Sequence, residues 1–209
     1  MIKIIGTIIV LVLIGVAGGA ATVYGGVYNV AATAQHWPVT YQVLDMARIR
    51  SIKAHAEGIV APDDLSKEAR VVGGTSHFSE HCSICHSAPG VEAEDMAEGM
   101  YPKPPMLTDV SKRYTPAQLF WILQHGIKMS GMPSWADHGD EALWDMVAFL
   151  EKLPDLSPAD YAKLVVAAKA AGGHHMHRGM NMGGMDMSGM KMSPDAPAGT
   201  AAPPSSQQH

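Results

Sequence analysis

The chain has 209 residues, a formal net charge of −5, and 47% hydrophobic but only 6% aromatic residues. This length holds one domain of ordinary size with attachments. The negative charge argues against a nucleic-acid-binding protein held by phosphate contacts. Two cysteines cannot form a disulfide framework, and because both lie in one short motif they indicate chemistry rather than cross-linking.

The chain begins with a long apolar segment. After Lys3, residues 4–30 carry no charged side chain, and about 20 apolar residues suffice to span a bilayer. We therefore expect residues 1–30 to be a transmembrane anchor or signal-anchor. A signal peptide cleaved after the small residues 32–34 is the alternative. Lys3 favours a cytoplasmic N-terminus, and both interpretations place the rest of the chain outside the cytoplasm.

Residues 31–65 are expected to form a membrane-proximal helix and a linker. Pro38 suits the first turn of a helix over 36–58, and Gly58 suits the position just past its end. Apolar residues such as Val39, Val43 and Met46 roughly share one face. The helix can therefore lie on the membrane surface, or pack on its own domain or on a partner subunit. The sequence does not decide between these positions.

Both cysteines lie in the segment Cys82-Ser83-Ile84-Cys85-His86. This pattern is typical of covalent haem attachment. Two thiols three positions apart can each add to a vinyl group of one porphyrin, and His86 can then take one axial position on the iron. A redox disulfide is expected in a βαβ setting, and a structural zinc site requires four ligands. Haem attachment is the favoured interpretation.

Helical periodicity surrounds this motif. Gly74, Phe78 and Cys82 recur every four residues, which places them on one helix face. Residues 140–153 form an amphipathic pattern with acidic residues in the first turn. The missing side chain of Gly74 would let this second helix cross close by, against Phe149.

These residues resemble the class I c-type cytochromes, over about residues 66–153. The segments YNVAATAQHW, YPKPPML and LFWILQHGIKMSGMPSW are also similar to membrane-anchored monohaem bacterial cytochromes c. The resemblance implies an all-α fold: a small helical domain (66–153) around one covalent haem, which is here followed by a helical extension (154–171). It also implies an electron carrier that is not itself an enzyme.

A second axial ligand is expected from a methionine. The domain offers Met96, Met100, Met106, Met129, Met132 and Met146, with His125 and His138 as ligands of another type. Met132 lies in a tight loop between Gly131 and Pro133. The family's ligand lies at the same place, so Met132 is the expected ligand and Met129 its closest rival.

The resemblance also assigns supporting groups around the haem. The carbonyl of Pro89 matches by position the group that orients the iron-bound histidine, here His86. The proline-rich segment 101–107 is expected to be an extended loop that covers the haem. Tyr101 and Trp121 are candidate hydrogen-bond donors to a haem propionate, whereas Trp135 is expected chiefly to pack against the ring.

Two protein-bound axial ligands leave the iron no vacancy, which favours one-electron transfer in the respiratory chain. We expect a bacterial inner-membrane protein with a periplasmic haem domain. Its expected partners are a dehydrogenase, a quinol-oxidising complex or a terminal oxidase. Residues 68–153 contain twelve acidic and six basic side chains, which favours basic docking surfaces on these partners.

Residues 172–209 lack apolar periodicity and are expected to be disordered. They hold seven of the fifteen methionines and three histidines within four residues (174, 175 and 177), a composition that suits copper. The alternative function is therefore a copper-handling protein whose haem serves copper redox chemistry or a copper enzyme. The candidate copper ligands are His174, His175, Met176, His177, Met180, Met182, Met185, Met187, Met190 and Met192.

Overall fold

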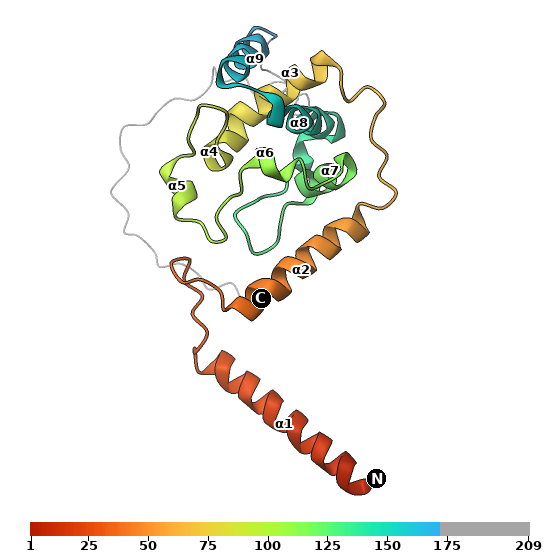
Figure 1. The fold of residues 1–209 in the computed structure, drawn as a ribbon, viewed down its shortest axis with the longest axis vertical. Coiled ribbons are helices and arrows are strands. Elements are labelled where there is room, and N and C mark those ends of the chain that lie inside the picture. The colour runs from red at the N-terminus through yellow and green to blue at the C-terminus, as the bar shows by residue number, and fades with distance from the viewer. Residues whose placement is uncertain (172–209) are drawn as a thin grey trace, which may run out of the picture. The chain divides into compact units, whose positions relative to one another are not determined.

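The computed structural model describes residues 1–171 (Figure 1). Within this part of the chain the regular elements are all helices, and the β structure is an isolated bridge between Ala88 and Val91. The expected all-α class is therefore confirmed. The expected copper ligands lie outside the described residues.

The first helix, α1 (Ile2–Tyr24), has no buried residue. It is the one helix in residues 1–171 that is long and apolar enough to cross a membrane, with a mean hydropathy of 2.5. At about 1.5 Å per residue, its 23 residues extend further than the roughly 30 Å of a bilayer's hydrocarbon core. Length and composition thus make α1 a candidate membrane anchor.

The second helix, α2 (Pro38–His55), begins at Pro38 as expected but ends three residues before Gly58. Gly58 instead adopts a φ of +85° in the turn that follows. Ile52 is fully buried, and Arg48 donates a hydrogen bond to the hydroxyl of Tyr114. Of the positions that the sequence left open, α2 therefore takes the one against its own domain.

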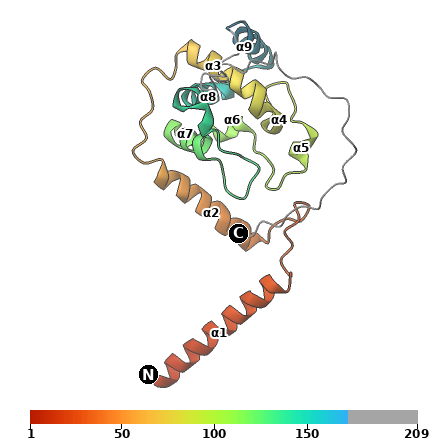
Figure 2. The same ribbon diagram turned by 180° about the vertical axis from the view of Figure 1, so that it is seen from behind.

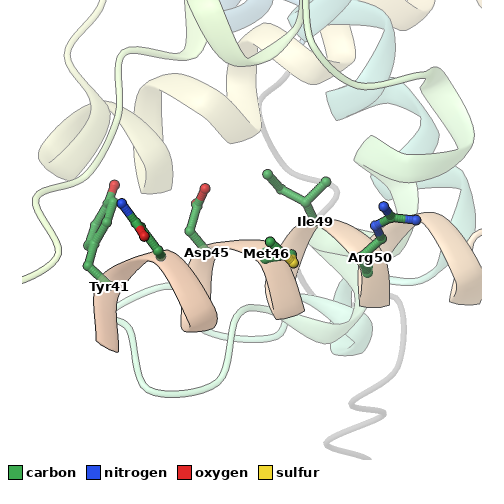
Figure 3. A pocket seen from close by; sticks show the side chains of 6 residues that line it. Tyr41, Asp45, Met46, Ile49 and Arg50 are labelled. Atoms are coloured by element: carbon green, nitrogen blue, oxygen red, sulfur yellow. The ribbon is translucent and has the colours of Figure 1, made fainter. Parts of the chain in front are cut away.

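The face of α2 that the sequence marked as apolar does not make this contact. Val39, Val43 and Met46 are all more than half exposed. A shallow pocket also runs along the helix (Figure 3), and its lining residues all come from α2: Tyr41, Gln42, Asp45, Met46, Ile49 and Arg50. Because no residue of the cysteine motif lines it, this pocket is separate from the site described below.

The core of the domain is the crossing of α3 (Glu68–His77) and α8 (Asp140–Lys152), which lie side by side in both views (Figures 1 and 2). A Cβ atom added to Gly74 would lie 1.9 Å from the carbonyl oxygen of Asp145 and 2.8 Å from the Cβ atom of Phe149. Only a glycine permits this approach. The crossing expected at Gly74 is confirmed.

Aromatic rings continue the core beyond this crossing. The ring of Phe78 lies 4.7 Å from that of Phe149, and it meets the ring of Tyr161 edge-on at 6.1 Å. Tyr161 belongs to α9 (Pro158–Ala170), which also packs on α3. The apolar face expected for the amphipathic segment 140–153 is buried. It consists of Leu143, Met146, Val147, Leu150 and Leu153.

The chain between α3 and α8 consists of shorter elements. Helix α7 (Pro116–His125) starts with a capping box in which the Thr115 side chain accepts from the backbone of Gln118. The others are η1 (Phe78–Cys82), α4 (Ser83–His86), α5 (Asp95–Glu98), α6 (Leu107–Val110) and η2 (Ala136–His138), and the short turn η3 (Leu153–Asp155) follows α8.

A polar contact fastens the α3–α8 crossing at its edge. The Arg70 guanidinium lies 2.7 Å from a carboxylate oxygen of Asp64 and 2.9 Å from one of Asp145, and it also meets Glu141 at 3.1 Å. The hydrogen bond to Asp64 is the largest of the effects that raise the Arg70 pKa. Burial raises the pKa of Asp145, and the hydrogen bond from Arg70 opposes that effect.

We expect Gly74→Ala to destabilise the holoprotein by at least about 2 kcal/mol, because the new methyl group meets backbone rather than a movable side chain. Gly73→Ala is the matched control. Its Cβ would lie 2.8 Å from Oδ2 of Asp145, a side-chain atom that can move, so its effect should stay within about 1 kcal/mol. Denaturant titration measures both, and equal effects would contradict the crossing.

We expect Arg70→Met to cost about 2 kcal/mol of unfolding free energy at neutral pH, because it leaves the partly buried Asp145 carboxylate without its partner. Lys67→Met removes a cation that is two-thirds exposed and pairs with Asp64 at 3.4 Å. That control should change stability by less than about 0.5 kcal/mol. Thermal unfolding that does not distinguish the two variants would show that the Arg70 contacts contribute nothing.

Candidate functional site

The cysteine motif begins where α3 changes its winding. After His77 the chain enters the π-helical turn η1, which carries Cys82 at its end, and α4 then carries Cys85 and His86. A π-helical turn inserts an i→i+5 hydrogen bond into a helix and occurs frequently at functional sites. Here the N–H of Ser83 donates to the carbonyl of Phe78. Gly74, Phe78 and Cys82 therefore lie on one continuous helical segment, which changes from α-helix to π-helix after His77.

The two thiols are not joined to each other, and Cys82 is buried whereas Cys85 is partly exposed. Burial raises the pKa of the Cys82 thiol to about 12, with a smaller contribution from Cys85. The group is therefore a neutral thiol at neutral pH. Attack on a disulfide requires a thiolate, which burial disfavours at this position. A neutral sulfur in an apolar site instead fits a thioether bond to a porphyrin.

His86 is oriented through one of its two ring nitrogens. Its Nδ1 lies 2.9 Å from the carbonyl oxygen of Pro105, so this nitrogen carries the hydrogen and donates it. Burial lowers the pKa of His86, and the bond to Pro105 opposes that effect only in part. The imidazole is therefore neutral, and Nε2 keeps a free lone pair. A metal-ligating histidine has this arrangement.

The expected role of Pro89 is corrected by this contact, because the carbonyl that accepts from His86 belongs to Pro105. Pro89 lies in a tight turn closed by hydrogen bonds in both directions between Ala88 and Val91. A Cβ atom on Gly90, next in the chain, would lie 2.9 Å from Pro158. The turn thus lies beside the start of α9, whereas the segment 101–107 brings Pro105 to His86.

The loop that contains Met132 is held by its own backbone. The Ile127 N–H donates to the Met132 carbonyl at 3.1 Å, and the Met132 N–H donates to the Ser130 hydroxyl at 3.2 Å. Gly126 has a φ of +65°, and a Cβ atom there would lie 2.7 Å from the Met132 carbonyl oxygen. Met132 itself is partly buried and packs against the hydrophobic core. This loop therefore holds the Met132 side chain in a defined place.

The rival methionines differ from Met132 in their surroundings. Met129 is 76% exposed, and Met96 and Met106 are also mostly exposed. Met146 is a core residue of α8, as expected. Met100, also one of the candidates from the sequence, lies beside the Met132 loop, because its Sδ would lie 2.9 Å from a Cβ atom on Gly131.

The two histidines considered as alternative ligands lie in other settings. His125 is exposed at the end of α7, where its ring lies 5.0 Å from that of Trp121. His138 lies in η2 and groups with His77 and His81. His81, which directly precedes Cys82, thus belongs to this group of three histidines.

Tyr101 and Trp121, the candidate hydrogen-bond donors to a haem propionate, have other partners in the structure. The Tyr101 hydroxyl accepts a hydrogen bond from the backbone of His36, and Trp121 packs against His55 of α2. Trp135 instead has a buried Nε1 with no hydrogen-bond partner among the described residues. An indole N–H of this kind suits an acceptor that the polypeptide does not supply.

A helical domain with two unpaired cysteines, a neutral histidine beside them and a fixed methionine loop defines a class of protein, the c-type cytochromes. Residues 69–150 match the family described as cytochrome C oxidase, cbb3-type, subunit III. The matched segment, which is less than half of the chain, is therefore a c-type cytochrome domain, which indicates a haem-based electron carrier. No curated protein and no solved structure gave a significant match.

Membership of this class implies a covalently bound haem c, and the donor set fits that group. Cys82 and Cys85 could provide the thioethers, and Nε2 of His86 could bind iron, while the buried N–H of Trp135 is available to a carboxylate. The tail residues proposed to bind copper lie outside the described residues, and their role stays a prediction.

Proposed function

We propose that this protein is a membrane-anchored, periplasmic one-electron carrier with a single haem c. Cys82 and Cys85 form its thioether bonds, and His86 and Met132 are its axial ligands. The observation that carries the proposal is the state of His86, whose Nδ1 is bonded to Pro105 while its Nε2 is free to bind iron.

The axial pair determines what the site can do. Haem c supplies a one-electron couple at its iron, and a thioether ligand raises the potential of that couple by favouring ferrous iron. With His86 and Met132 both bound, no position is left for oxygen or a substrate. The hydrogen bonds of the Met132 loop support this ligand by limiting the movement of its backbone. These features support electron transfer rather than catalysis.

The proposed location rests on α1. This helix is apolar along its whole length, and no part of the described chain covers it. Lys3 at its start favours retention of the N-terminus on the cytoplasmic side. The haem domain then lies on the periplasmic side of the inner membrane, where haem attachment and respiratory partners are both expected.

The proposed partner follows from the family match. The matching family is described as a subunit of a cbb3-type cytochrome c oxidase. We propose that the acceptor is a terminal oxidase and that the donor is a dehydrogenase or a quinol-oxidising complex. The excess of acidic side chains in residues 68–153 favours basic docking surfaces on these complexes.

We expect Cys82→Ser and Cys85→Ser each to reduce covalent haem content, and the double variant to abolish it. Serine cannot form a thioether, and noncovalent haem is released on denaturation. Haem-dependent peroxidase staining of a denaturing gel measures the bound fraction. Ser83→Ala, which lies between the two cysteines, is the matched control and should stain like the unchanged protein. Persistent staining of the double variant would refute the attachment.

We expect Met132→Ala to remove the weak near-infrared sulfur-to-iron absorption band of the oxidised protein and to lower its reduction potential. Met129→Ala is the control, because Met129 is largely exposed and should leave both properties unchanged. Met100→Ala tests the neighbour of the Met132 loop in the same way. If the band persists in Met132→Ala but is lost in either other variant, that methionine is the ligand and our assignment is wrong.

A further inference from the structure

A second group of potential metal ligands lies outside the His86–Met132 site. His77, His81 and His138 each offer a ring nitrogen, and these three atoms all lie within 4.8 Å of one another. His77 and His81 are four residues apart, at the end of α3 and in η1, which places them on the same side of this helical segment. His138 comes from η2, in the loop that leads into α8.

The surroundings of these rings favour a bound cation. The Nε2 atom of His81 is buried and has no hydrogen-bond partner in the described chain, although a buried polar atom of this kind normally has one. The nearest carboxylate, that of Glu80, lies 4.0 Å away, beyond hydrogen-bond distance. Asp137 precedes His138, and His77 is itself buried. The cluster therefore combines imidazole nitrogens with nearby negative charge.

We propose that His77, His81 and His138 form a binding site for a divalent transition-metal ion of the zinc class. Three neutral imidazoles with a fourth position for water are an established zinc donor set. Tetrahedral geometry with Zn–N bonds of 2.0–2.1 Å separates the nitrogens by about 3.4 Å. Small side-chain rotations are enough to reach that spacing from the observed separations of at most 4.8 Å.

The ion would link two segments that are far apart in the sequence. His81 directly precedes Cys82, and His138 lies in the same loop segment as Met132, after Trp135. The Trp135 ring packs against both His81 and His138, with centroid separations of 5.4 and 5.3 Å. Bound metal would thus fasten the loop between α7 and α8 to the helical segment that carries the cysteine motif.

Zinc titration of the full-length holoprotein tests this site. In every protein tested, His174, His175, His177 and His209 are replaced by glutamine, so that histidines of the tail do not contribute. Calorimetry against a competing chelator should show one tight site. His138→Gln and His81→Gln should each weaken it by at least about tenfold, since even the loss of an outer-sphere partner has effects of 10- to 100-fold.

His125→Gln is the matched control, because this histidine is exposed and lies outside the cluster. Zinc K-edge absorption should show three imidazole nitrogens at about 2.0 Å. The haem spectrum verifies folding of each variant, and if one variant fails to fold, the other decides. Equal zinc affinity in a folded cluster variant and in the control would overturn the proposal. The proposal would also be overturned if calorimetry showed no tight zinc site, or if His81 were hydrogen-bonded to a haem carboxylate in the zinc-treated holoprotein.

Discussion

The fold depends on the contact between α3 and α8 at Gly74. The absence of a side chain there lets the backbone of Asp145 approach so closely that a Cβ atom would lie 1.9 Å from its carbonyl oxygen. This approach brings Phe78 against Phe149 and permits Arg70 to reach Asp145. The η1 turn, and with it Cys82, continues directly from α3. The position of the haem-binding motif is therefore set by a helix contact about two to three turns away.

The two ends of the proposed haem site are supported in different ways. The cysteines and His86 lie on one continuous helical segment, whereas the partner of His86 is a backbone carbonyl 19 residues further on. Met132 depends on a loop stabilised by local hydrogen bonds and by the positive φ of Gly126. Site geometry of this kind requires that the loops between α4 and α8 are ordered, because they supply both the partner of His86 and the Met132 loop.

The histidines show how the same residue type takes different roles. The burial of His86 and its single hydrogen bond suit an iron ligand, whereas His125 is exposed at a helix end. The sequence offers His138 beside His125 as an alternative axial ligand, but in the structure His138 groups with two histidines of the α3–η1 segment. Because His77 and His81 are four residues apart on a helical segment, the sequence already indicates that they lie close together. Their closeness to His138 follows only from the way the α7–α8 loop folds back.

The sequence by itself determined the helical class, the amphipathic face of α8, the glycine crossing and the chemistry of the cysteine motif, because each depends on local spacing or on residue type. Only the tertiary structure decided that Pro105 rather than Pro89 orients His86, since a carbonyl acceptor carries no side-chain signature. It also placed α2 on its own domain and Met100 beside the Met132 loop. These contacts join segments distant in the chain, and they depend on how the loops pack rather than on any periodic pattern.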